Sequence, residues 1–198
     1  MAKKDLVVSL QNVIDTIRDA LDKEAVKAAF FCALSIPDIC AQIEFSNSQL
    51  KRMETGDRYI KWYNENIFAY ENPPKGVAMN QLDGTVAYLI RCKMFHEGQL
   101  LHKHTLKKLE NNYEELIKND EKFKFSEIFF NFKFVTTDVE SYSIGYASVD
   151  INNRPIGPIT INAEVDPKLL SQKLMWTAEG VIRNFNEKQK NNPSSIKR

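Results

Sequence analysis

Cysteine, glycine and proline are all scarce in this chain, and each scarcity excludes a class of protein. The 198 residues include three Cys, seven Gly and seven Pro. Cys32, Cys40 and Cys92 form no CxxC pair and their number is odd, so the sequence indicates neither a disulfide framework nor a zinc site. We expect these thiols to be buried small hydrophobes in a reducing compartment. The low Gly and Pro content excludes collagen-like and low-complexity chains.

Net charge and long apolar runs are lacking as well. Lys and Arg number 27 and Asp and Glu 26, a formal net charge of +1, which gives no overall attraction to nucleic acid or to an anionic membrane. Any nucleic-acid contact must come from a local patch. The longest strictly apolar run, 28–34, is far shorter than the roughly 20 residues that a membrane span needs, and polar residues interrupt any signal-peptide core. We expect a soluble, cytoplasmic protein with no membrane contact.

Several enzyme motifs are also missing. The sequence contains no GxGxxG, P-loop, HExxH, GxSxG or protein-kinase set. Nucleotide hydrolysis, zinc proteolysis and serine hydrolysis are therefore not expected.

The first part of the chain has the periodicity of helices. Apolar residues recur three and four apart over 5–21 and form one stripe, which predicts an amphipathic helix. Further helices are predicted over 24–36, over 38–43 after a break at Pro37, and over 58–68, 84–96 and 99–118. Residues 45–57 are expected to form a polar connector and 70–81 a loop.

The pattern changes to a period of two after residue 124. Strands are predicted over 125–135, 141–151 and 158–165, followed by a helix over 166–187 and a disordered tail over 189–198. We expect an α+β protein. A helical region, 1–118, precedes a three-stranded antiparallel sheet and a C-terminal helix, 124–188, and the two halves pack as one domain.

One segment, 89–98, carries residues suited to phosphodiester chemistry. Arg91 and His96 lie five residues apart on the helix predicted over 84–96. Neutral His can take a proton from an attacking 2′-OH or give one to the leaving oxygen, and Arg can stabilise the charge that builds up on the phosphate. The two side chains lie about 140° apart around an ideal helix. They converge only if the helix unwinds near Gly98 or if two helices face each other across a dimer axis.

The Arg-x4-His pattern on a helix of a bundle resembles the ribonuclease signature of the HEPN superfamily. The stretches ALSIPDICAQIE, RYIKWYNENI and YLIRCKMFHEG, which together span 33–98, also resemble segments of a group of uncharacterised bacterial proteins. The resemblance implies a HEPN-like helical bundle and a metal-independent endoribonuclease, of the toxin or phage-defence kind. It also implies a homodimer in which two motifs form one composite site, with Arg91 and His96 as its catalytic residues and no cofactor.

Neighbouring residues complete the predicted site. The residues that would contact the RNA backbone are Lys93, His102, Lys103 and Lys107. Asp38 or Glu97 would position the catalytic pair, and Glu44 is a further carboxylate that could turn toward Arg91. Two of these assignments have a plainer interpretation. The residues from His102 onward suit a solvated helix face, and Asp38 suits the first turn of a helix.

Two further alternatives stay open at this point. The basic and aromatic residues between 58 and 63 either stack on bases or pack in the core. The chain as a whole is either a ribonuclease or a non-catalytic HEPN-like interaction or scaffold protein. In a scaffold protein, Arg91 and His96 would hold helices together, and the Phe-rich strand half would bind a partner.

Overall fold

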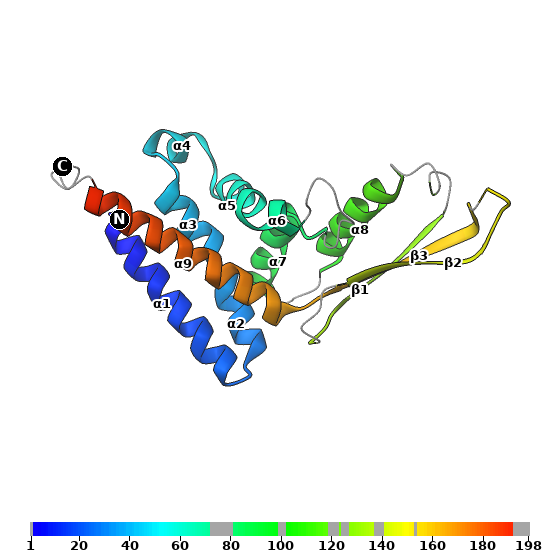
Figure 1. Ribbon diagram of the computed structural model, residues 1–198, viewed down its shortest axis with the longest axis horizontal. Coiled ribbons are helices and arrows are strands. Elements are labelled where there is room, and N and C mark those ends of the chain that lie inside the picture. The colour runs from blue at the N-terminus through cyan, green and yellow to red at the C-terminus, as the bar shows by residue number, and fades with distance from the viewer. Residues whose placement is uncertain are drawn as a thin grey trace.

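The computed structural model describes residues 2–71, 81–98, 102–118, 123, 127–136, 141–152 and 154–191. The molecule is elongated, with a bundle of helices at one end and a sheet that projects from the other (Figure 1). The elements are α1 (Lys3–Asp22), α2 (Val26–Ala33), α3 (Ile36–Glu44), α4 (Asn47–Arg52), α5 (Thr55–Tyr63), the π-helix η1 (Asn64–Phe68), α6 (Ala69–Glu71), α7 (Gly84–Glu97), α8 (Lys103–Lys118), β1 (Ile128–Phe134), β2 (Ser141–Val149), β3 (Pro155–Val165) and α9 (Pro167–Asn191).

The bundle forms because each helix buries one apolar stripe. Along α1 the fully buried positions are Leu10, Ile14 and Ile17, spaced by three and four residues. Helices α2, α3 and α9 pack against this stripe, so the last helix of the chain returns to the first and both described ends lie at the same end of the bundle (Figure 1). The largest side chains of the core are Trp62, Tyr59 and Tyr63, all from α5.

The predicted α+β class is confirmed, but the antiparallel sheet is wrong in one pairing. The strand order is β1-β3-β2. β2 and β3 form the expected antiparallel hairpin, whereas β1 runs parallel to β3. β3 takes the central place because Ile159, Ile161 and Ala163 put one apolar face into the core. A period of two in the sequence tells which side chains share a face of the sheet. It does not tell which strand pairs with which, or in which direction.

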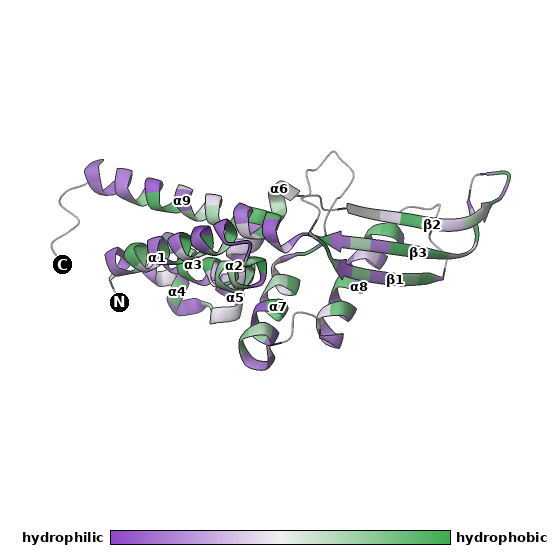
Figure 2. Ribbon diagram, turned by 90° about the horizontal axis from the view of Figure 1, so that it is seen from below, coloured by the Kyte–Doolittle hydropathy of each residue, from purple (hydrophilic) through white to green (hydrophobic). Residues whose placement is uncertain are grey.

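The two faces of the sheet differ. Phe130 lies against Tyr113 of α8, with ring centroids 5.6 Å apart, and Phe134 lies against Phe30 of α2 at 5.8 Å. The opposite face is polar and carries a hydrogen bond between Asn131 and Asn162, and the same side includes the Lys133–Glu164 ion pair. Phe129 also lies on this side, and 52% of its surface is exposed. The sheet projects beyond the helices, which leaves this face largely open (Figure 2).

The helix ends agree with the sequence in most places. Asp166 accepts the backbone N–H of Lys168 at 2.7 Å and begins α9 as predicted. Helix α9 then continues through Asn191, so the predicted tail is helical at its start, and 192–198 lie outside the described residues. The prediction of a polar connector over 45–57 is wrong, because this segment contains the helix α4. The overlooked signal is a capping box, in which Ser46 and Gln49 each bond the other's backbone N–H.

One stretch of the described chain, Val26–Glu44, is long and apolar enough to cross a membrane by length and composition, with a mean hydropathy of 1.4. Half of that stretch is buried inside the protein. It is divided into α2 and α3, and both helices supply core residues such as Phe30 and Ile36. This is the environment of a core helix.

Helices α5 and α7 approach each other closely at Gly84, and this contact provides a stability test. A Cβ at Gly84 would lie 2.5 Å from the carbonyl oxygen of Ile60 and 2.9 Å from Oδ1 of Asn64, which also accepts the Gly84 N–H at 2.7 Å. We expect Gly84→Ala to lower the free energy of unfolding by about 1–3 kcal/mol, as overpacking of a core does.

The control for this variant is Gly180→Ala in α9, where the nearest atom to the new Cβ is 3.8 Å away. This change should raise stability by about 0.5–1 kcal/mol, since Ala is the better helix former. Urea unfolding measures both. Equal effects of the two changes would contradict the tight α5–α7 packing.

Candidate functional site

Helix α7 carries the candidate site and has well-defined ends. Asp83 accepts the Val86 N–H at 2.8 Å as the N-cap, and Asn112 of α8 donates to the other oxygen of Asp83 at 3.0 Å. At the far end Gly98 has a φ of 67°, the left-handed conformation that commonly terminates a helix. Asp and Gly are residue types that a sequence pattern favours at the start and the end of a helix. The helix is continuous from Gly84 to Glu97, without unwinding between Arg91 and His96.

Arg91 is held by one group from another helix and by one group from its own helix. Its Nη2 donates to Oδ2 of Asp38 in α3 at 2.9 Å, and the two side chains are 24% and 14% exposed. The guanidinium lies 5.0 Å from the ring centroid of Phe95, one turn along α7, and Phe95 stacks on Phe31 of α2 at 4.2 Å. Arg91 thus connects α3, α7 and α2 while part of it remains accessible.

A buried polar layer lies beneath Arg91. The hydroxyl of Tyr59 and the Nε of Arg91 are buried and have no hydrogen-bond partner among the described residues. Burial raises the pKa of Tyr59 well above its usual value, and the nearby Asp38 carboxylate adds to this effect. Tyr88 packs against Tyr59 with centroids 5.3 Å apart. Burial and a side-chain hydrogen bond with Cys92 raise the pKa of Tyr88.

The same environment also shifts the pKa of Asp38. Burial raises its pKa above the ordinary carboxyl value of 3.8, and the charges of Arg91 and Arg58 offset only part of that shift. The cost of desolvation therefore exceeds the gain from pairing, which is the usual balance for a partly buried ion pair.

His96 lies apart from Arg91. Its side chain is exposed on the last turn of α7. No hydrogen bond or ion pair joins the two residues within the described part of the chain. Five residues of regular helix place them about 140° apart, so a single chain does not bring both to one phosphate. The sequence suggests two ways in which Arg91 and His96 could come together. The helix does not unwind between them, so the alternative that remains is the pairing of two copies of the chain.

Glu97 turns toward Lys93, with which it forms an ion pair one turn back along α7. The hydrogen bond from Lys93 lowers the pKa of Glu97. Glu44 likewise faces away from Arg91, because it accepts the indole N–H of Trp62 at 2.6 Å. Of the three candidate carboxylates, only Asp38 reaches Arg91.

The predicted RNA-contacting residues gather where α7 ends and α8 begins. His102 lies at the start of α8, and its Nδ1 accepts the backbone N–H of His104 at 3.2 Å. Partial desolvation and the Lys93 charge lower the pKa of His102. Lys103 is exposed, and Lys107 pairs with Glu110 at 2.8 Å, which raises the pKa of Lys107. This end therefore presents imidazole and ammonium groups together.

The burial of the aromatic residues and the cysteines decides between interpretations that the sequence left open. Tyr59, Trp62 and Tyr63 are buried, so the base-stacking interpretation is wrong for these three residues. Cys40 is buried, Cys32 and Cys92 are half-buried, and burial raises the pKa of Cys32 and Cys40. No group of three His, Cys, Asp or Glu side chains with a metal-binding arrangement occurs among the described residues.

The support that Arg91 receives from Phe95, and through it from Phe31, was not predicted from the sequence. The spacing of Arg91 and Phe95, four apart on a predicted helix, was a usable signal for the first contact. The Phe31 contact crosses between helices, and no local pattern carried it.

Comparisons of the chain with known protein families, with curated proteins and with solved structures find no match.

The raised pKa of Asp38 predicts how stability depends on pH. Just above pH 3.8 the folded chain retains a proton that the unfolded chain has lost, so the Asp38 contribution falls as pH rises and levels off above the folded-state pKa. We expect the stability of wild type relative to Asp38→Asn to decrease as the pH rises from 3.8.

Urea unfolding at each pH measures this difference. Asp57→Asn, at an exposed position of α5, controls for the loss of one carboxylate. A relative stability that increases with pH would mean that pairing with Arg91 outweighs burial.

Proposed function

We propose that this protein is a metal-independent endoribonuclease of the HEPN type that acts in the cytoplasm as a toxin or phage-defence component. One observation carries the proposal. Asp38 and Phe95 hold the Arg91 guanidinium in a fixed, partly accessible position, and the same helix presents an exposed imidazole, His96, five residues later.

The roles follow from the chemistry of each group. His96 would exchange protons with the 2′-OH and the leaving oxygen, and Arg91 would stabilise the negative charge on the phosphate. Asp38 would keep the guanidinium oriented. Lys93, His102, Lys103 and Lys107 would contact the RNA backbone, and Glu97 would position Lys93 through their ion pair. None of these roles requires a metal.

The proposal requires two copies of the chain. Because α7 is a regular helix, the Arg91 of one copy must act with the His96 of another. The stacked pair Phe31 and Phe95 supports an interface here, because both rings are more than a third exposed and lie beside Arg91. The active form would then be a homodimer with α7 near its axis.

The first test is RNA cleavage by the pure protein in EDTA. We expect wild type to cleave a structured RNA and to leave DNA of the same sequence intact, because the reaction uses the 2′-OH. Arg91→Ala and His96→Ala should each lower the rate by about 100-fold or more. His104→Ala, a change at another exposed histidine, should have little effect, and circular dichroism verifies the fold of each variant. Undiminished cleavage by both site variants would rule out the assignment.

The second test asks whether the two residues act across an interface. Arg91→Ala and His96→Ala chains with different tags are co-expressed, and the mixed dimer is isolated through both tags. It keeps one Arg91 and one His96 on different chains, so we expect about half the wild-type activity.

The matched control is a mixed dimer of wild type with the double variant, in which both residues lie on one chain. It should be inactive. Activity only in this control would contradict a shared site.

A non-catalytic scaffold is the second candidate, and one observation favours it. Arg91 already bonds Asp38 and stacks on Phe95, so it connects three helices without any ligand. Under this alternative the chain cleaves no RNA in EDTA, and Arg91→Ala mainly lowers the melting temperature.

A further inference from the structure

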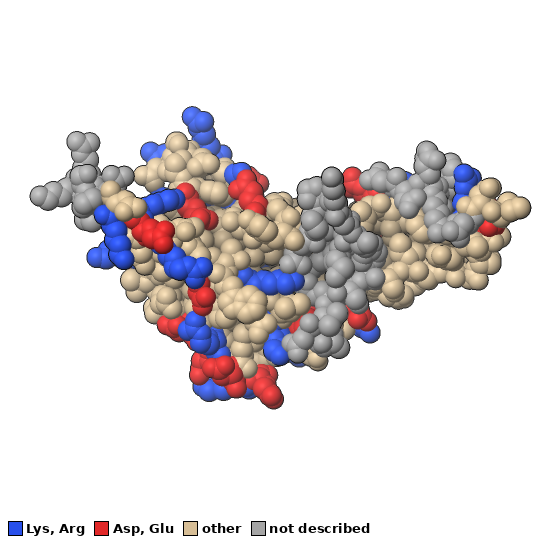
Figure 3. Space-filling view, viewed as in Figure 1, with Lys and Arg blue, Asp and Glu red and all other residues tan. Residues whose placement is uncertain are grey.

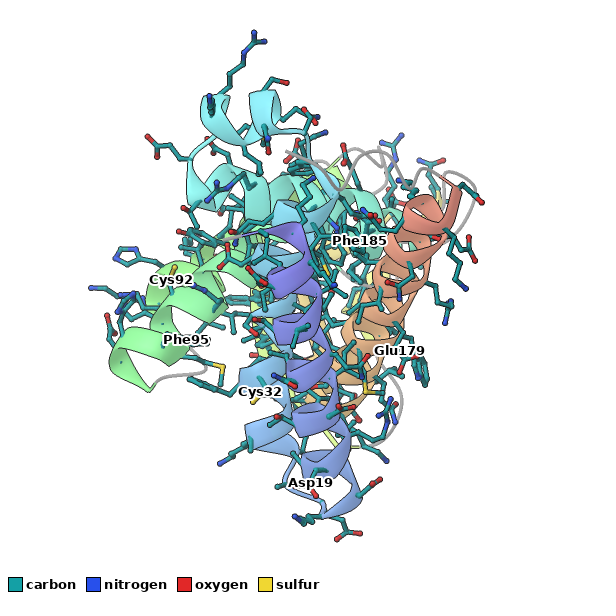
Figure 4. The ribbon with its side chains drawn as sticks, turned by 90° about the vertical axis from the view of Figure 1, so that its left-hand side faces the viewer. Asp19, Cys32, Cys92, Phe95, Glu179 and Phe185 are labelled. Carbon is teal, nitrogen blue, oxygen red and sulfur yellow. The ribbon has the colours of Figure 1, made fainter. Side chains whose placement is uncertain are left out.

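A groove runs along α9 on the side of the bundle away from α7. Figure 2 shows α9 and α7 on opposite faces, and in Figure 4 the labelled Cys92 and Phe95 of α7 lie on the other side of the bundle from Glu179 and Phe185 of α9. The groove lies where α9 faces α3 and η1. It is separate from the Arg91 site.

The groove has the size of a small-molecule site. Its main cavity has a volume of about 430 Å³, within the range of roughly 300–1,000 Å³ that such sites have. An adjoining hollow of about 190 Å³ shares Glu44, Val181 and Asn184 with it. The α9 residues that line the two hollows recur every three or four positions from Lys173 to Lys188, so one face of this helix forms a continuous wall.

Two exposed aromatic rings line the main cavity. Trp176 is 55% exposed and Tyr70 is 79% exposed, although tryptophan is usually largely buried. The other tryptophan of the chain, Trp62, is fully buried and bonded to Glu44. An exposed indole and phenol on a cavity wall offer flat faces on which a heteroaromatic ring can stack.

Polar groups suited to the edge of such a ring lie in the same cavity. The Glu44 carboxylate already accepts one N–H, from Trp62, and a carboxylate can accept several. Asn66 and Asn184 contribute amides, each of which can donate and accept. Asn66 belongs to the π-helix η1, an element that is frequent at functional sites.

The far end of the groove is cationic. Lys3 donates to the carbonyl oxygens of Ile43 and Phe45 at 2.7 and 2.8 Å, which holds its ammonium at the end of α3. Burial and the nearby charge of Lys188 lower the pKa of Lys3, and Glu44 offsets part of this effect. With Lys173 in the main cavity, the groove holds three ammonium groups and one carboxylate. Figure 3 shows basic and acidic side chains intermixed over this face of the bundle.

The length of the groove limits its occupant. Trp176 and Lys188 are twelve positions apart on α9, which is about 18 Å at 1.5 Å per residue. A lysine side chain covers part of that distance. A base stacked on Trp176 therefore needs an extended anionic chain, longer than a single phosphate, to reach Lys3 and Lys188.

We infer that this groove binds a nucleoside triphosphate, with the base against Trp176 and Tyr70 and the terminal phosphates between Lys3 and Lys188. The inference concerns binding alone and does not depend on the proposed ribonuclease activity.

The test is titration calorimetry of the full chain with ATP, GTP and AMP in EDTA. We expect at least one triphosphate to bind and AMP to bind at least ten-fold more weakly. Trp176→Ala and Lys188→Ala should each weaken triphosphate binding ten-fold or more. Phe129→Ala and Lys190→Ala remove an exposed ring and an exposed ammonium outside the groove and should leave binding unchanged.

Three results would overturn the inference. They are no triphosphate binding at millimolar concentration, equal binding in the groove variants and their controls, or binding of a short oligoribonucleotide in preference to any triphosphate. The oligoribonucleotide is tested with the Arg91→Ala/His96→Ala double variant, so that cleavage does not affect the result. Circular dichroism shows that each variant is folded.

Discussion

The ion pair with Asp38 is the interaction that orients the Arg91 guanidinium on the candidate face. It joins residues 53 positions apart and links α7 to α3. Both groups are partly buried, so each has lost hydration that the other restores only in part, and the raised pKa of Asp38 reflects that imbalance. Removing either partner would leave the other charge without compensation. The position of α7 itself comes mainly from its packing against α5.

The regularity of α7 limits how Arg91 and His96 can act together. Since α7 is continuous to Glu97 and ends sharply at Gly98, the guanidinium and the imidazole point in different directions from one chain. A ribonuclease built on them must combine two chains. The stacked rings of Phe31 and Phe95 give the same face an apolar surface beside the guanidinium. Catalysis and association are therefore properties of one surface in this proposal.

The bundle has two chemically distinct faces that share their supporting helices. α3 contributes Asp38 to one face and Glu44 to the other, and α5 places Tyr59 near the first and Trp62 beneath the second. The α7 face combines a held guanidinium with histidines. The α9 groove combines exposed aromatic rings with lysines. This arrangement allows the proposed binding of RNA at the α7 face and of a nucleoside triphosphate in the α9 groove to take place on opposite sides of one core.

The sequence by itself determined the elements and many of their ends. Apolar spacing predicted α1, α7 and α9, and Asp83, Gly98 and Asp166 act as the capping residues that their types suggest. Local patterns carry such information because caps and faces depend on neighbours within a few residues. Tertiary structure alone decided that β1 pairs in parallel with β3, that Glu44 bonds Trp62, and that Phe31 stacks on Phe95. Those contacts join distant segments, and their geometry exists only once the core has packed.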